Sequence, residues 1–123
     1  MPCRTVRQLL AHISGFHRQL GAFYEETAAK ADQERAKALL EYMSRHEEHL
    51  KDCLGAYEKD ASEAILDTWI QFMPDITKCE CFERMEVSED MSIDDVVRIS
   101  LWFDDCLIQF FREMADLSVH RHQ

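Results

Sequence analysis

Apolar residues recur at helical spacing in the first part of the chain, between Val6 and Ala31. They form two adjoining rows: Val6, Leu9, Ile13, Phe16, Leu20 and Phe23 in one, and Leu10, Ile13, His17, Leu20, Tyr24, Ala28 and Ala31 in the other. Steps of three and four residues place side chains on one face of an α-helix. Thr5 and Gln8 have the spacing of a capping box, so we predict that this helix begins there.

The apolar pattern changes phase near Asp32. An extension of the second row would bury Arg35, Arg45 and His49, which would make the buried face too polar. The apolar row instead restarts as Ala36, Leu40, Met43, Glu47, Leu50, Leu54 and Tyr57. Because Asp32 is a favourable N-cap residue, we predict a second helix that begins there and returns antiparallel to the first after a very short turn.

Two further helices are predicted in the second half of the chain. The first is short, from about Ala61 to Met73; Asp60 and Glu63 cap its start, and its apolar face comprises Ile65, Leu66, Trp69, Ile70 and Met73. Residues 74–91 show no convincing period. The last helix begins at a Ser92–Asp95 capping box, and its apolar row comprises Val96, Ile99, Phe103, Leu107, Phe110, Met114 and Leu117.

Together these elements predict a single all-α domain over residues 1–123. We expect a bundle of three long helices and one shorter helix, with a long connection before the last helix. The 123 residues include only three glycines and two prolines, fewer turn residues than a sheet protein of this length needs. No apolar run is long enough to span a membrane, and the N-terminus lacks the apolar core of a signal peptide.

Charge and cysteine content narrow the choice of partners and compartment. The net charge of −10 makes nucleic acid and anionic membranes poor partners. The cysteines are odd in number and irregularly spaced: Cys3, Cys53, Cys79, Cys81 and Cys106. This pattern favours reduced thiols over a disulfide framework, with Cys79 and Cys81 as free thiols of a connecting segment. We therefore predict a soluble, cytoplasmic protein.

Three polar residues interrupt the apolar rows of the long helices. His17 lies between Ile13 and Leu20, Glu47 lies between Met43 and Leu50, and Asp104 borders the row of the last helix. Burial of an unpaired charge is costly, so inward-facing polar groups in a bundle pair with one another, bind a metal or lie at a hydrated edge. His17, Glu47 and Asp104 are therefore the candidate site residues.

Two stretches of the chain carry a family resemblance. "FYEETAAKADQERAKALLEYMSRHEEHL", residues 23–50, resembles the first helical hairpin of rubrerythrin-like proteins of the ferritin superfamily, and "LWFDDCLIQFFREMAD", residues 101–116, resembles a later helix of that family. The resemblance implies a ferritin-like up-down bundle. It also implies a di-iron site built from a Glu on each of two helices and a Glu-x-x-His pair on each of the other two.

The metal ligands of that family are only partly present. By the resemblance, His17 stands where the first helix offers Glu, Glu47 matches the glutamate of the second helix, and Asp104 matches a carboxylate of the last helix. Leu50 and Leu107 stand where the partner histidines are expected, and no Glu-x-x-His occurs anywhere in the chain. An intact di-iron site within one chain is therefore not predicted, and ferritin-like redox chemistry does not follow from the fold.

Two functional hypotheses remain. The first is a non-catalytic interaction or regulatory module in which the inward polar residues are a hydrogen-bonded or ion-paired relic, with a protein partner and no enzyme activity. The second is a protein that binds iron, manganese or zinc through His17, Glu47, Asp104 and His46, in a reduced site or one shared between subunits. We expect a homodimer in either case, because the short third helix leaves the long helices incompletely covered.

The stretch "HEEHLKDC", residues 46–53, adds further candidate ligands. His46 and His49 have i,i+3 spacing and could share a transition metal, and His49 with Cys53 at i,i+4 forms an N/S pair suited to zinc. The alternative is a polar helix flank with His46 packed beside Met43 and Leu50. Trp102 lies opposite the main row of the last helix, where an aromatic residue favours an oligomer interface over a cofactor site.

Overall fold

The computed structural model describes residues 4–70 and 88–121, with side chains described over residues 5–70 and 88–114. The described chain is predominantly helical, which confirms the predicted all-α class. Three helices are long, namely α1 (Val6–Lys30), α2 (Glu34–Asp60) and α4 (Ile93–Arg121). The remaining elements are short: the one-turn helix α3 (Glu63–Leu66) and the two-residue strands β1 (Arg4–Thr5) and β2 (Trp69–Ile70). No described helix is long and apolar enough to cross a membrane.

The α1–α2 hairpin forms as predicted, apart from its second cap. At the start of α1 the Thr5 hydroxyl accepts the backbone N–H of Gln8 at 3.2 Å, and the Gln8 side chain accepts the N–H of Thr5 at 2.8 Å. Helix α1 ends at Lys30, close to the predicted phase change. The N-cap of α2 is Gln33 and not Asp32. Instead, the backbone N–H of Asp32 donates to the carbonyl of Glu89 at 2.7 Å, so this turn holds the segment before α4.

The predicted third helix over residues 61–73 is wrong in length. Only Glu63–Leu66 are helical, and the cap is Ser62 in place of Asp60, since the Ser62 hydroxyl accepts the N–H of Ile65 at 3.3 Å. The chain then extends into β2, which pairs antiparallel with β1. This backbone pairing competes with continuation of the helix, and it leaves the Trp69 side chain 67% exposed. Met73 lies outside the described residues.

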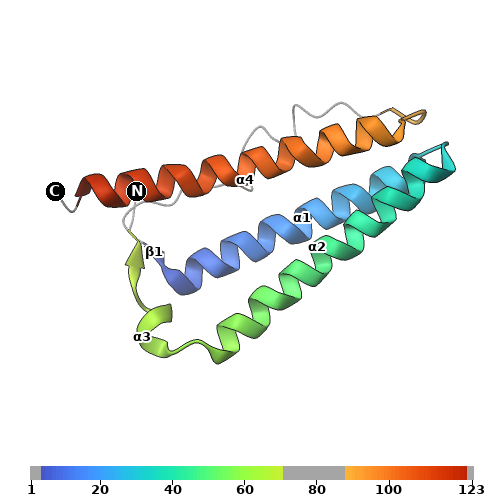
Figure 1. The fold of residues 1–123 in the computed structure, drawn as a ribbon. Helices are drawn as coiled ribbons and strands as arrows, with labels where there is room; N and C mark the ends of the chain where they lie inside the picture. The colour runs from blue at the N-terminus through green and yellow to red at the C-terminus, as the bar shows by residue number, and fades with distance from the viewer. Residues whose placement is uncertain (1–3, 71–87, 122–123) are drawn as a thin grey trace.

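Helix α4 lies lengthwise beside the hairpin (Figure 1). The predicted capping box is confirmed: the Ser92 N–H donates to the Asp95 carboxylate at 3.0 Å, and the Ser92 hydroxyl accepts the N–H of Asp95 at 3.2 Å. The predicted apolar row faces the hairpin, with Val96, Ile99, Phe103, Phe110 and Met114 buried. Leu117 lies beyond the described side chains.

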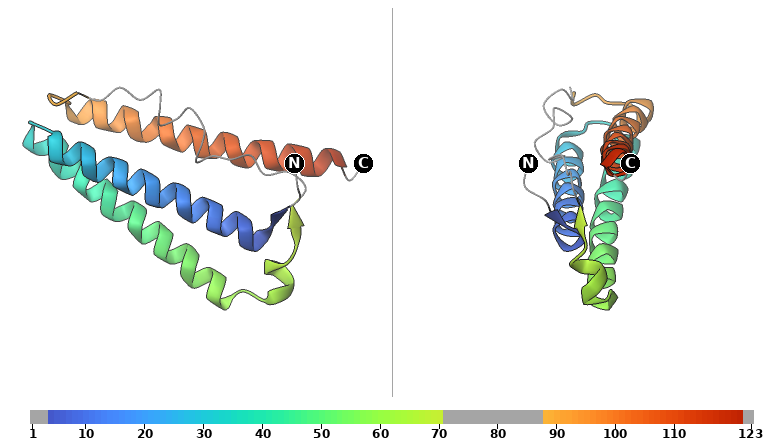
Figure 2. Two further views of the ribbon diagram at one scale, coloured as in Figure 1. Left: turned by 180° about the vertical axis from the view of Figure 1, so that it is seen from behind. Right: turned by 90° about the vertical axis from the view of Figure 1, so that its left-hand side faces the viewer.

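The direction of α4 follows from its ring contacts with α1. Ring contacts join His12 near the start of α1 to Phe110, and Phe23 near its end to Phe103, at centroid distances of 5.8 and 5.4 Å. Helix α4 therefore runs antiparallel to α1 and parallel to α2, and both side views show this arrangement (Figures 1 and 2). It begins beside the α1–α2 turn, at the opposite end of the molecule from β2.

The core is built mainly from the inner rows of the three long helices. Phe16, Tyr24, Leu40 and Phe103 are among its largest fully buried side chains. Tyr24 and Phe103 meet edge to face, with ring centroids 6.2 Å apart, an arrangement that aromatic pairs favour. The predicted inner row of α2 fails at its last member, because Tyr57 is 51% exposed.

Candidate functional site

The centre of the candidate site is a buried pair between α1 and α2. Nδ1 of His17 lies 2.6 Å from Oε1 of Glu47, and the two side chains are only 10% and 11% exposed. Because a carboxylate only accepts hydrogen bonds, Nδ1 of His17 is the donor when Glu47 is ionised. Two of the three polar residues found on the apolar rows are thus each other's partners.

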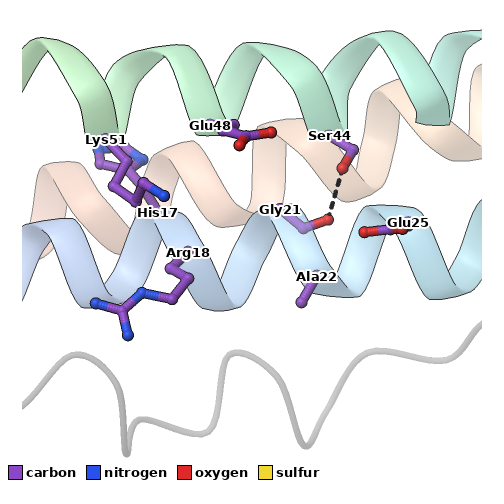
Figure 3. Close-up of a pocket in the computed structure, with 8 residues that line it drawn as sticks. All are labelled: His17, Arg18, Gly21, Ala22, Glu25, Ser44, Glu48 and Lys51. Atoms are coloured by element: carbon purple, nitrogen blue, oxygen red, sulfur yellow. Dashed lines mark hydrogen bonds between the residues drawn. The ribbon is translucent and has the colours of Figure 1, made fainter.

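A close approach of the two helices positions this pair. Gly21 lies one turn after His17, and the Ser44 hydroxyl donates to the Gly21 carbonyl at 2.9 Å, as Figure 3 shows. A Cβ atom at Gly21 would lie 3.4 Å from Cβ of Glu47. The absence of a side chain at Gly21 therefore lets α2 bring Glu47 against α1, within reach of His17.

All four sequence-predicted site residues line one cavity of about 220 Å³ between the three long helices. Each helix contributes four residues: Phe16, His17, Leu20 and Tyr24 from α1; Met43, His46, Glu47 and Leu50 from α2; and Ser100, Phe103, Asp104 and Leu107 from α4. His17 and Glu47 are buried, whereas His46 and Asp104 are exposed. Among the described residues, however, no three His, Cys, Asp or Glu side chains are arranged so that they could hold a metal ion.

The electrostatics of the cavity disfavour further negative charge. The pKa of Asp104 is raised, first because burial penalises its charged form and then because Glu47 and Asp105 are negative; His46 and His17 partly oppose the shift. Burial also raises the pKa of Tyr24 well above its usual range, with Glu47 as the next cause. Both shifts favour the protonated forms of these two side chains.

Tyr24 and Ser100 are cavity residues that the sequence reasoning missed as site residues. The sequence places Tyr24 in the apolar row of the first helix, where its ring is buried, and a side-chain hydrogen bond with Ser100 acts on its hydroxyl. The available signal was a tyrosine on the same helical row as His17, since a buried tyrosine hydroxyl usually has a polar partner.

The histidines of residues 46–53 point to different neighbours. The His46 ring stacks on Tyr42 in the preceding turn, with centroids 6.3 Å apart and planes 4° apart, and it is exposed on the helix flank, where it lines the cavity with Met43 and Leu50. His49 and Cys53 are exposed, and Nε2 of His49 lies 3.6 Å from Sγ of Cys53. The predicted i,i+4 pair is therefore formed.

The cysteines differ from the expectation of uniformly reduced thiols. Cys53 is a free thiol on the surface of α2, in agreement with that expectation. Cys106 on α4 is disulfide-bonded, so the expectation is wrong there. Spacing along the sequence cannot reveal such a bond, because it depends on which segments the fold brings together. Cys3, Cys79 and Cys81 lie outside the described residues.

A second opening lies on the other side of the α1–α2 contact (Figure 3). It is lined by His17, Arg18, Gly21, Ala22, Glu25, Ser44, Glu48 and Lys51. His17 is the residue it shares with the first cavity. Arg18 and Lys51 are balanced by Glu25 and Glu48, so this opening offers no preference for a ligand of either charge.

Comparison of the chain with protein-family models, with curated proteins and with solved structures gives no match in any of the three.

Proposed function

We propose that this chain is a ferritin-like helical module without catalytic activity that acts through protein contacts, and that it forms a homodimer. The observation that carries the proposal is a second apolar row on α4. Besides its buried row, α4 exposes Val97, Leu101, Ile108 and Phe111, with exposed fractions of 44%, 57%, 48% and 42%.

The position of this row supports a protein contact. Its members lie three, four or seven residues apart on one face of the helix and extend over about 20 Å, at a rise of about 1.5 Å per residue. A surface helix normally carries one apolar stripe, toward the core. Exposed apolar side chains grouped on one face of a helix in this way favour an interaction site.

The helix count and directions support a ferritin-like module completed by a second copy. Ferritin-like bundles have four long helices and one long crossover. Here α2 and α4 are parallel, as a crossover requires, and the described chain supplies three long helices. A second copy packed on the exposed row would occupy the place of the missing helix.

The His17–Glu47 contact supports the absence of metal chemistry. Glu47 is the carboxylate at the ligand position of the second helix in the family resemblance, and here it is engaged by His17 at 2.6 Å. A carboxylate that already has a buried partner is a poorer ligand for a metal than one pointing into an open site. A buried hydrogen-bonded pair of this kind is compatible with a role in helix register.

The test is the molar mass in solution, measured by size exclusion with light scattering at tens of micromolar. We expect a dimer for the natural chain and a monomer for Leu101→Lys/Ile108→Lys, because two ammonium groups cannot be buried in the contact. Ile65→Lys, at an exposed apolar position on α3, is the matched control and should remain dimeric. A clean monomer of 14.5 kDa for the natural chain would contradict the proposal.

A second candidate function is binding of iron, manganese or zinc. The observation in its favour is that His17, Glu47, His46 and Asp104 line one cavity. Its test is elemental analysis of protein purified without an affinity tag, with His17→Ala and Glu47→Ala as variants. Stoichiometric metal that is lost in both variants would favour this candidate over the first.

A further inference from the structure

His49 and Cys53 have the geometry of two ligands of one tetrahedral metal ion. Zinc binds histidine nitrogen at about 2.0–2.1 Å and cysteine sulfur at about 2.3 Å. At the tetrahedral angle these two bond lengths put nitrogen and sulfur about 3.6 Å apart. The distance between Nε2 of His49 and Sγ of Cys53 is 3.6 Å, so the separation of these two atoms suits a single bound ion.

The pair is accessible, but it is incomplete within one chain. Both side chains are exposed on α2, and the Cys53 thiol is free. His46 is one turn away, but its ring is stacked on Tyr42. No third histidine, cysteine or carboxylate completes a metal site within the part of the chain that the structure describes. An ion held by His49 and Cys53 therefore has two further positions to fill.

We propose that a zinc-like divalent ion is bound between two copies of this chain, by His49 and Cys53 of each. A two-fold contact brings the same surface of both copies together, so two identical pairs meet at the axis. The result is a closed Cys2His2 set, which is a standard structural zinc site. Each Cys53 thiol releases its proton to solvent when its sulfur binds the ion.

The chemistry of the donor atoms sets the choice of cation at this contact. One divalent ion with two thiolates is neutral as a unit, so it adds no charge to an interface between two chains that each carry a net charge of −10. Zinc is favoured over magnesium or calcium, because a nitrogen–sulfur set is a poor site for cations that prefer oxygen.

The location of the His49–Cys53 pair agrees with the proposed homodimer. The inference rests on that proposed function, because the second copy of the chain supplies two of the four ligands. His49 and Cys53 lie three and seven residues after His46, and therefore on the same side of α2. His46 lines the cavity opposite Asp104 of α4, near the exposed row of that helix. One two-fold contact can thus cover both the α4 row and the metal pair.

The experiment is a titration of chelator-treated protein with Zn²⁺ and with Co²⁺, in oxygen-free buffer without a reductant, which keeps Cys53 reduced and the Cys106 disulfide intact. We expect one ion per two chains, thiolate-to-cobalt charge-transfer absorption, and a dimer dissociation constant lowered by at least an order of magnitude. His49→Ala and Cys53→Ser should each abolish the absorption and the tightening. Asp52→Asn, an exposed neighbour that is not a ligand, should retain both.

Three outcomes would overturn the inference. A dimer whose dissociation constant is unchanged by zinc removes the metal site and leaves the proposed function intact. One zinc per monomer, with no change in molar mass, shows that the pair binds the ion without a second copy. A chain that stays monomeric with and without zinc contradicts both this inference and the proposed dimer.

Discussion

At the scale of single residues, the two partners of the buried pair are not equivalent. Removal of His17 leaves the buried carboxyl group of Glu47 without its partner, whereas removal of Glu47 leaves an imidazole, which carries no obligatory charge. Breaking a buried pair costs several kcal/mol when a charge is left unpaired, and replacing both partners with apolar residues is often neutral or stabilising.

Substitutions of His17 and of Glu47 should therefore have different effects on the free energy of unfolding. We expect His17→Leu to lower the free energy of unfolding by about 3 kcal/mol, because Glu47 is left buried and unpaired. Glu47→Leu and the double variant should be neutral or more stable than the natural chain. Urea unfolding at pH 7 of the natural chain, the two single variants and the double variant measures these free energies. Equal losses in both single variants would show that the pair itself stabilises the fold.

Tyr24 predicts a loss of stability at high pH. Its pKa in the folded chain is raised, first by burial and then by Glu47. The raised pKa adds to the free energy of unfolding. This contribution is fully present below the ordinary tyrosine pKa of 10.0 and is lost as the pH rises above that value. Thermal unfolding between pH 8 and 11 should show a decline that Tyr24→Phe reduces. Tyr57→Phe, at an exposed tyrosine, should leave the decline unchanged.

At the scale of elements, the α1–α2 hairpin depends on a close helix contact at one glycine. Gly21 faces Glu47 and Ser44, whereas a Cβ atom at Gly15, on the same helix, would have no neighbour within 4 Å. Both are helix-interior glycines with a conformational cost, but only Gly21 has a packing reason.

Substitutions at these two glycines should have opposite effects. Gly15→Ala should raise the free energy of unfolding by about 0.5–1 kcal/mol, because it lowers the entropy of the unfolded chain without a new clash. Gly21→Val should lower it by about 1–3 kcal/mol, since branched carbons would push Glu47 and Ser44 away. Urea unfolding followed by circular dichroism tests both, and a stabilising Gly21→Val would rule out the close contact.

Local signals predicted the starts of the first and last helices correctly, but the caps of the second and third helices and the length of the third helix incorrectly. The capping boxes at Thr5 and Ser92 form as predicted, because each involves residues only three apart. The segment after Asp60 has a helical apolar pattern, yet Trp69 and Ile70 pair with β1, more than sixty positions earlier in the chain. Helix propensity is a weak effect, and here the backbone pairing of β2 with β1 outweighs it.

At the scale of the whole molecule, both ends of the helix array are tied by long-range polar contacts. At one end the α1–α2 turn binds residues 89 and 90. At the other end Arg7 of α1 lies near three carboxylates, with distances of 2.7 Å to Glu63, 3.5 Å to Asp67 and 4.0 Å to Glu58. These groups are solvent-exposed, so salt should weaken their interaction.

Arg7 therefore predicts a salt-dependent stability difference. Arg7→Gln should unfold more easily than the natural chain in low salt, because three carboxylates lose their shared cation in a chain of net charge −10. In 1 M NaCl, where the Debye length is about 3 Å, the difference should nearly vanish. Arg98→Gln, which loses a contact with the single carboxylate of Asp95 among the described residues, is the control. A difference that persists in high salt would indicate a packing role for Arg7.

The local pattern of the chain was sufficient for the all-α class, for most of the bounds of the three long helices and for the inward positions of His17 and Glu47. Those features depend on neighbours a few residues away, and helical periodicity records them directly. The tertiary structure decided that His17 pairs with Glu47, that α4 lies parallel to α2 and that Cys106 is disulfide-bonded. These outcomes join residues far apart in sequence, and no short-range period carries information about such contacts.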